Sequence, residues 1–529
     1  MRFSIFSIPL IFIATIICCS KKPAEQSHPL EYKTYSEQHR PQFHFSPKEK
    51  WMNDPNGMVY YNNEYHLFYQ YYPDSTVWGP MHWGHAVSKD MIYWEHLPVA
   101  LYPDSIGMIF SGSAVVDRNN SSGLGLNGQP PLIAIFTYHD MEAEKAGHID
   151  YQTQGLAYSN DNGRTWTKYA GNPVLKNPGI KDFRDPKVSW YEADQKWIMT
   201  LAVHDHVSFY SSKDLLHWTK ESDFGFDIGS HEGVWECPDL FRLRCRNEDT
   251  VKWVLLLSIN PGGPNGGSAT QYFVGNFDGK SFTNDNSAAP VWLDAGRDNY
   301  AGVTWSDIPE NDGRRLFLGW MSNWMYAMQV PTDKWRSAMT IPRELTLFHT
   351  IEGYRLFSYP VVELEKLRSS AFSLDSQTFI GHLDLTSKLG FSPQQMEVNL
   401  EFESPDSLAD YGIELSNSKG EIYRVGYSGS KKGYYSDRSL AGKSDFNDSF
   451  AGKVIIVPGM MNVNTKSLRL FIDVASAELF AEGGSVVMTE IFFPNENYNR
   501  VQLYTMNGPV KIKKATFYSI RSIWNESEE

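Results

Sequence analysis

The chain has 529 residues, of which 41% are hydrophobic and 21% charged, so it is long enough for two globular domains. Its formal net charge of −14 argues against a nucleic-acid partner, because phosphate binding needs clustered Lys and Arg. Aromatic residues make up 14% of the chain, a high share that is typical of proteins that stack on sugars or bases. Most of these rings are expected in strands and the core, and sugars remain as a candidate partner.

The N-terminus carries a targeting signal. Residues 1–19 are predicted to be a lipoprotein signal peptide, whose apolar stretch over 5–17 is too short to span a membrane stably. Cys19, or as second choice Cys18, is the predicted lipidated residue; an ordinary secretory signal is the alternative. Residues 20–38 are polar and contain proline, as a tether would. We expect an extracytoplasmic protein in the bacterial cell envelope, periplasmic or at the surface, with membrane contact only through a lipid anchor.

Residues 51–57 read Trp-Met-Asn-Asp-Pro-Asn-Gly. The proline pushes Asp54 into extended geometry, and the Asn-Gly pair is a strong tight-turn signal. Aromatic runs at 58–61 and 65–72 follow, which predicts a β-hairpin. The Asp54 carboxylate therefore lies on a rigid bend at the entrance to a strand, where a reacting group can be held still. The alternative is an Asx-turn in which Asp54 only bonds its own backbone.

A short pattern recurs between predicted strands. Residues 88–94 (Ser-Lys-Asp-Met-Ile-Tyr-Trp) are matched by 212–218 (Ser-Lys-Asp-Leu-Leu-His-Trp), with looser copies at 159–166 and 276–282. Their spacing is that of propeller blades with loops of variable length. Together with short strands broken by Gly, Pro, Asn and Asp, the repeat predicts a five-bladed β-propeller over 39–350.

The remainder of the chain has a different pattern. Residues 351–374 are predicted to be a linker. After it, strand-like alternation separated by turn residues predicts a β-sandwich over 375–525, without an obvious catalytic cluster. The predicted fold is thus all-β, a five-bladed β-propeller followed by a C-terminal β-sandwich.

Two more carboxylates lie in short contexts of their own. Asp185 stands in Phe-Arg-Asp-Pro, and Glu236 in Trp-Glu-Cys-Pro-Asp. Taken singly, the first reads as an Arg–Asp surface pair and the second as a glutamate at a strand end. Together with Asp54 they place three acids, each near a proline, on different predicted blades. Such a set suits an acid, a base or nucleophile, and a stabiliser around one sugar ring.

In this order, the three segments resemble the signature motifs of glycoside hydrolase family 32, the invertase, inulinase and levanase family of β-fructosidases. The resemblance spans about 39–525, and the combination of motifs is specific although Arg-Asp-Pro alone would not be. A departure is the Met-Tyr-Ala-Met segment at 325–328, which we expect to affect substrate fit. Further similar segments lie at 68–73, 110–113, 294–301, 319–324, 342–345 and 470–480.

The resemblance implies retaining hydrolysis of β-fructofuranosides, with no metal and no organic cofactor. By matching positions, Asp54 would be the nucleophile, Glu236 the general acid/base and Asp185 the transition-state stabiliser. The apolar neighbours of Glu236 in the sequence are expected to favour its protonated form, and Arg184 is expected to keep Asp185 ionised. The residues expected to contact substrate are Trp51, Asn53, Gln70, Trp78, Phe110, Ser111, Ser113, Arg184 and Trp320.

The expected substrate is a fructan polysaccharide or oligosaccharide (levan, inulin or fructo-oligosaccharides), with sucrose as a further candidate. We expect a pocket for one fructosyl unit, and hence attack at chain ends with release of fructose. An endo-levanase or endo-inulinase, a fructosyltransferase and a non-catalytic fructan-binding lipoprotein are the alternatives. The choice between β-2,1 and β-2,6 linkages stays open, as does the oligomeric state.

Overall fold

The structure is a computed structural model that describes residues 1, 35–403, 408–460 and 465–524. The predicted lipidation site Cys19 and the predicted tether up to residue 34 lie outside the described residues. The last four residues assigned to the tether are instead docked on the fold, where Tyr35 stacks on Trp524 at a ring-centroid distance of 3.9 Å. Among the described residues, no helix is long and apolar enough to cross a membrane.

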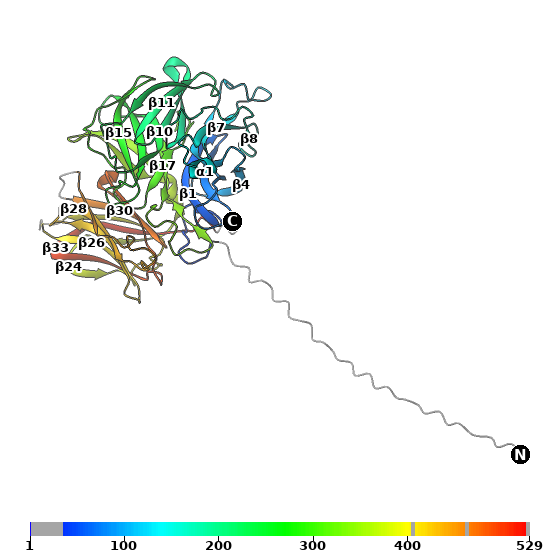
Figure 1. The fold of residues 1–529 in the computed structure, drawn as a ribbon. Coiled ribbons are helices and arrows are strands. Elements are labelled where there is room, and N and C mark those ends of the chain that lie inside the picture. Colours follow the sequence, from blue (N-terminus) through cyan, green and yellow to red (C-terminus); the bar gives the residue numbers. More distant parts are fainter. Residues whose placement is uncertain (2–34, 404–407, 461–464, 525–529) are drawn as a thin grey trace.

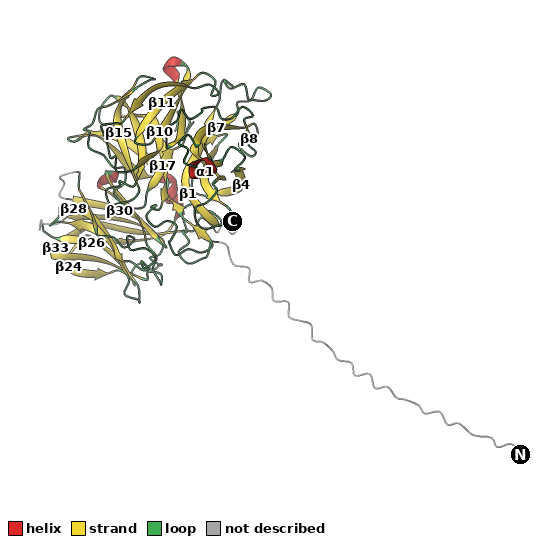
Figure 2. Ribbon diagram, viewed as in Figure 1, coloured by secondary structure: helices red, strands yellow, loops and turns green. Residues whose placement is uncertain are grey.

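The regular secondary structure of the described chain is almost entirely strand, and the first part forms a five-bladed propeller (Figures 1 and 2). Blade one contains β1 (Lys50–Tyr61), β2 (Glu64–Tyr72), β3 (His82–Ser88) and β4 (Glu95–Leu101). Blade two contains β5 (Met108–Val116), β6 (Leu132–His139), β7 (Gln152–Ser159) and β8 (Thr167–Lys168). Blade three contains β9 (Phe183–Tyr191), β10 (Lys196–Val203), β11 (His206–Ser212) and β12 (Thr219–Phe224). Blade four contains β13 (Val234–Arg244), β14 (Val251–Asn260), β15 (Ala269–Phe277) and β16 (Phe282–Asn284).

Blade five closes the ring. It contains β17 (Tyr300–Thr304), β18 (Arg315–Met321), β20 (Ala338–Met339), β21 (Arg343–Thr350) and β22 (Gly353–Pro360). The short strand β19 (Trp335–Arg336) leaves this blade and pairs in parallel with β1, so that Lys50 lies opposite Trp335. This pairing joins the last blade to the first strand of blade one.

The repeated sequence pattern forms related aspartate-capped turns in four blades, between the third and fourth strands. In the first copy, Asp90 accepts the N–H groups two and three residues later, and the Trp94 indole donates to the carbonyl three residues earlier. Asp214 and its following tryptophan repeat these bonds in blade three. Asp161 and Asp278 accept backbone N–H groups in the corresponding turns of blades two and four. The propeller prediction is confirmed, and the repeat is explained by its turn chemistry.

The second domain is a two-layered β-sandwich, formed by residues 368–520. The strand β33 (Arg500–Ile520) is long enough to pair with strands of both layers. Along β33 and the neighbouring strands, buried side chains partly alternate with more exposed ones. The buried side chains form one apolar core between the layers. The other strands are β23 (Arg368–Leu374), β24 (Gln377–Asp384), β25 (Met396–Glu403), β26 (Asp410–Ser416), β27 (Ile422–Ser428), β28 (Gly433–Leu440), β29 (Ile455–Pro458), β30 (Thr465–Asp473), β31 (Ser476–Ala481) and β32 (Val486–Ile491).

The predicted linker 351–374 is wrong in its extent. Its first half is strand β22, which pairs with β21 in the propeller, and its last part is strand β23, which pairs with β33 in the sandwich. The connection between the domains is the short 3₁₀ helix η2 (Val362–Leu367), which buries Leu364 and Leu367. The other helical segments are α1 (Met141–Lys145), η1 (Glu192–Asp194) and η3 (Glu482–Gly484).

The two domains share a buried seam. One apolar cluster contains Trp320 and Ile341 of the propeller together with Phe471 and Phe480 of the sandwich. Beside it, the buried imidazole of His44 contacts two sandwich carboxylates at 2.8 Å each, those of Asp473 and Glu478. Because the seam combines apolar packing with buried ion pairs, the sandwich is a fixed part of the propeller's support.

Candidate active site

The first strands of the five blades, β1, β5, β9, β13 and β17, contact one another around the propeller axis. Each has a shift of register close to its N-terminal end. A β-bulge of this kind bends a strand and re-aims its side chains, and such bulges are common next to active sites. Asp185, Cys237 and Ala301 take equivalent places in three of the bulges, with φ angles of 63°, 46° and 52°. This repeated left-handed backbone turns the strand ends toward one pocket.

The Asp54 carboxylate is held by neutral donors. Ser111 Oγ donates to Asp54 Oδ2 at 2.8 Å, and Asn53 Nδ2 donates to Oδ1 at 3.0 Å. The Cys237 thiol faces Oδ2 at 3.7 Å. Burial raises the pKa of Asp54, and the nearby charge of Glu236 raises it further. A carboxylate with a raised pKa and neutral partners keeps its basicity, and therefore its strength as a nucleophile.

Asp185 lies beside Asp54 and shares the Cys237 thiol with it, at 3.6 Å from its own Oδ2. The Cys237 backbone N–H donates to the same oxygen at 3.0 Å. Burial raises the pKa of Asp185 to about 7, with the charges of Glu236 and Asp54 adding to the effect and Arg184 opposing it. The expectation that Arg184 keeps Asp185 fully ionised is therefore corrected, because burial outweighs the guanidinium.

The Glu236 carboxylate is held by one cationic side chain, that of Arg184, and one phenolic side chain, that of Tyr300. Arg184 donates from Nη2 at 2.9 Å and from Nε at 3.2 Å to Oε1, and the Tyr300 hydroxyl donates to Oε2. The remaining arm of Arg184 pairs with Asp182 at 2.6 Å. Trp235 was expected to form part of an apolar environment around the Glu236 carboxyl group. Its side chain lies instead in the core between blades three and four. Consecutive strand residues point to opposite faces, which explains the difference.

The three carboxylates line one pocket of about 270 Å³ at the N-terminal ends of these inner strands. Six of the nine residues expected to contact substrate line it with them, from four different strands and one loop. The full lining is Asn53, Asp54, Gln70, Trp78, Phe110, Ser111, His139, Glu144, Tyr151, Gln152, Asp182, Arg184, Asp185, Glu236 and Trp324.

Three of the residues expected to contact substrate do not line the pocket. Trp51 and Trp320 have no exposed surface and pack behind Trp324, at ring-centroid distances of 5.9 and 4.9 Å. Ser113 Oγ accepts the backbone N–H of Val188 and donates to the Pro186 carbonyl, each at 2.9 Å, which joins β5 to β9. The placement of these three residues makes them supports of the pocket wall, and the contact prediction is corrected for them.

The structure adds pocket residues that were not among the nine expected to contact substrate. Trp324 forms one wall, and the loop between β6 and β7 contributes a second with the helix α1. Here His139 stacks on Phe110 at 4.3 Å and contacts Glu144 of α1 at 3.0 Å. Asp182 could have been found from its position two residues before Arg184. The β6–β7 loop carries no signal of comparable strength.

The charges of the pocket exclude one class of ligand. Five carboxylates line it, and Arg184 is the guanidinium that opposes them. Anionic substrates are disfavoured by such a surface, whereas a neutral polyol finds many acceptors and donors for its hydroxyl groups. Among the described residues, no group of three or more His, Cys, Asp or Glu is arranged to hold a metal ion.

A larger cavity, of about 430 Å³, lies toward the other end of the same inner strands. Lys187, Asp239 and Arg315 line it, and Lys187 is paired with Asp239 at 3.3 Å. None of the three predicted catalytic carboxylates reaches this cavity. The smaller pocket is therefore the candidate active site, because it contains the three carboxylates, although the other cavity is larger.

A pair of bulge-mounted carboxylates facing a small polyol pocket defines a glycoside hydrolase. Residues 44–360 match the N-terminal domain of glycosyl hydrolases family 32, and residues 363–519 match the family's C-terminal domain. The levanase of Bacillus subtilis (strain 168) is 51% identical over 494 residues, which are 93% of this chain and 72% of the levanase. The extracellular exo-inulinase of Aspergillus awamori is 37% identical over 524 residues, 93% of this chain and 96% of the inulinase.

Solved structures agree. The crystal structure of exo-inulinase from Aspergillus awamori superimposes with a TM-score of 0.84 at 34% identity, covering 93% of this chain and all of the inulinase chain. A β-fructofuranosidase from Schwanniomyces occidentalis, complexed with fructosyl-erythritol, gives a TM-score of 0.79 at 32% identity, over 93% of this chain and 99% of that chain. The chain belongs to glycosyl hydrolases family 32 and is a glycoside hydrolase that acts on fructosyl bonds.

Proposed function

We propose that this enzyme is a retaining exo-β-fructosidase that removes terminal fructosyl units from a fructan. The size of the pocket carries the exo assignment: about 270 Å³ is at the low end for ligand sites, which suits one sugar ring and not a chain passing through. The names of the relatives, levanase and exo-inulinase, support a fructan as the substrate.

The geometry suggests a role for each carboxylate. Asp54, held by neutral donors, attacks C2 of the fructosyl unit, and the bond from C2 to the leaving oxygen breaks. Glu236 gives its proton to that oxygen, which leaves as an alcohol. Glu236 then takes a proton from water, the resulting hydroxide attacks C2, and Asp54 is released. Asp185 is buried beside Asp54 and is placed to bond sugar hydroxyls, while Arg184 and Tyr300 orient Glu236.

The assigned roles are tested by substitution. Asp54→Asn and Glu236→Gln should each lower kcat by at least about a hundredfold, because each removes a group that takes part in bond making or proton transfer. Asp278→Asn, in an exposed turn of blade four, is the matched control and should keep full activity. Near-normal turnover in a folded Asp54→Asn enzyme would contradict the nucleophile assignment.

The mode of attack is tested by chromatography of early digests of levan, inulin and sucrose. Free fructose as the dominant early product supports exo-attack, and a ladder of short oligosaccharides would indicate endo-attack. With sucrose, equal release of glucose and fructose indicates hydrolysis. An excess of glucose would indicate transfer of fructosyl units to another sugar, as in a fructosyltransferase.

We further propose that the enzyme lies outside the cytoplasm and is attached to a membrane by a lipid on Cys19. The proposal rests on the signal-like segment 1–19 and on the extracellular naming of a relative. Changing Cys18 and Cys19 together to Ala should move the enzyme from the membrane fraction to the soluble fraction and abolish labelling by a fatty-acid analogue. Unchanged fractionation and labelling would show that neither cysteine carries the lipid anchor.

A further inference from the structure

One wall of the pocket is connected to the Asp54 carboxylate by a chain of contacts. Trp324 lines the pocket and stacks on the buried Trp51 at 5.9 Å. The indole N–H of Trp51 donates to Asn53 Oδ1 at 2.7 Å, and Asn53 Nδ2 donates to Asp54 at 3.0 Å. The position of Trp324 therefore affects both the space for the sugar and the support of Asp54.

The turn that carries Trp324 is fixed at both ends by polar groups of the propeller. On one side Asn323, which is fully buried, donates to the Arg297 carbonyl at 2.9 Å and accepts the Met325 N–H at 3.0 Å. On the other side the Tyr326 hydroxyl donates to Asp298 Oδ1 at 2.6 Å. The turn is thus attached to the segment that leads into β17.

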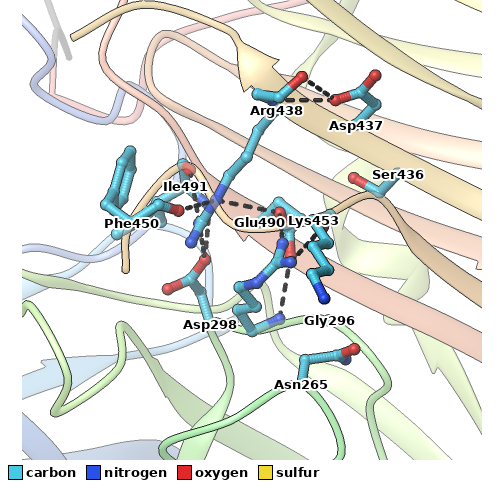
Figure 3. A network of polar contacts seen from close by, with 12 residues as sticks. Asn265, Gly296, Asp298, Ser436, Asp437, Arg438, Phe450, Lys453, Glu490 and Ile491 are labelled. Atoms are coloured by element: carbon cyan, nitrogen blue, oxygen red, sulfur yellow. Dashed lines mark hydrogen bonds and ion pairs between the residues drawn. The ribbon is translucent and has the colours of Figure 1, made fainter. Parts of the chain in front are cut away.

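The sandwich supplies the group that holds this attachment (Figure 3). Arg438 on β28 reaches out of the sandwich and donates from Nη1 to Asp298 Oδ2 at 2.6 Å and from Nη2 to the Tyr326 hydroxyl at 2.9 Å. Its guanidinium lies 4.2 Å over the ring of Phe450. The side chains of Arg438 and Asp298 are fully buried, so water does not compete for these bonds.

A second sandwich contact reaches the same turn. Asn447 Nδ2 donates to the Met325 carbonyl at 3.0 Å. In addition, Asp298 lies two residues before Tyr300, whose hydroxyl donates to Glu236. The sandwich therefore touches a segment that serves the pocket wall and a segment that serves Glu236.

We propose that Arg438 is a positioning residue through which the sandwich sets the active-site wall formed by Trp324. The proposal rests on the pocket being the substrate site. A planar guanidinium that bonds a carboxylate and a phenol together fixes their relative orientation, which packing of apolar groups alone does not do. The binding of the terminal fructosyl unit thus depends on a residue of the non-catalytic domain.

Tyr326→Phe is the main test, because it removes the shared hydroxyl and leaves Arg438 paired with Asp298. Couplings through such networks correspond to changes of about twofold to thirtyfold, so we expect KM for 1-kestose or sucrose to rise in this range with a smaller change in kcat. Arg438→Lys should act in the same direction, since a lysine cannot bond both partners with the same geometry.

Arg368→Met is the matched control, because this arginine also pairs with a fully buried sandwich carboxylate, that of Glu397, but does not contact the Trp324 turn. It should lower the thermal midpoint and leave KM unchanged. A KM that rises equally in the control and in Tyr326→Phe would mean that general destabilisation is the cause, and would overturn the proposal.

The dependence on Trp324 is tested by a double substitution. Trp324→Ala should raise KM on its own, and adding Tyr326→Phe to it should have little further effect, because both act through the same wall. Fully additive effects would overturn the role of the network. If Trp324→Ala leaves KM unchanged while Asp54→Asn removes turnover, the pocket assignment stands and the proposal for Arg438 fails.

Discussion

Replacing Asp185 by Asn should stabilise the folded enzyme at neutral and alkaline pH while it removes activity. The pKa of Asp185 is raised by burial from its ordinary value of 3.8 to about 7. The folded chain therefore keeps a proton at Asp185 that the unfolded chain releases between about pH 4 and pH 7. Stability falls as the pH rises through this window, and the full difference above pH 7 corresponds to about 4 kcal/mol. Asn cannot ionise and avoids this loss.

The assay is thermal unfolding of the wild type and of Asp185→Asn at pH 4 and pH 8. The stability advantage of Asn should be largest at pH 8 and shrink toward pH 4. Asp182→Asn is a neighbouring control for which the expected pH dependence of stability is reversed. Burial raises the pKa of Asp182, but the charge and the hydrogen bond of Arg184 lower it by more. That variant should lose stability at pH 8 and lose less at low pH. An Asp185→Asn enzyme that is destabilised equally at both pH values would refute the reasoning.

Three further predictions concern other parts of the molecule. Ser111→Ala removes one neutral hydrogen bond to Asp54 and should lower kcat by about twofold to tenfold, measured by fructose release. Tyr300→Phe removes a hydrogen-bond donor that orients the Glu236 carboxyl group, and should lower kcat by about twofold to tenfold in the same assay. Burial opposes protonation of His44, but its two carboxylate partners raise its pKa to about 9. Stability from His44 should therefore be complete below about pH 6.5 and lost as the pH rises through 9, and thermal unfolding of His44→Gln should lack this slope.

The propeller could be predicted because its evidence is local. The Ser-x-Asp…Trp repeat specifies a turn through bonds within a few residues, such as those of Asp90 and Asp214, and a related turn appears in each blade that has the pattern. The boundary between the domains could not be predicted in this way. Strands β22 and β23 both lie within the predicted linker, and their partners, β21 and β33, lie in different domains, which is a property of long-range pairing.

The convergence of the three carboxylates was predicted from their motifs, and the structure brings them into one pocket. The details that failed depend on which way a side chain turns. Trp51 and Trp320 carry aromatic rings suited to a sugar, yet both are turned into the core behind Trp324. Arg184 was expected to serve its neighbour Asp185, but the bulge in β9 turns it toward Glu236. Positions of bulges and their φ angles are not visible in a single sequence.

The stereochemistry of transfer to methanol tests the central proposal most directly. When sucrose is cleaved in the presence of methanol, some of the fructosyl groups are trapped as methyl fructofuranoside, which does not interconvert between anomers. Attack by Asp54 followed by attack of methanol inverts C2 twice, so NMR should show methyl β-fructofuranoside. Formation of the α-anomer would mean a single displacement, and would contradict Asp54 as the nucleophile.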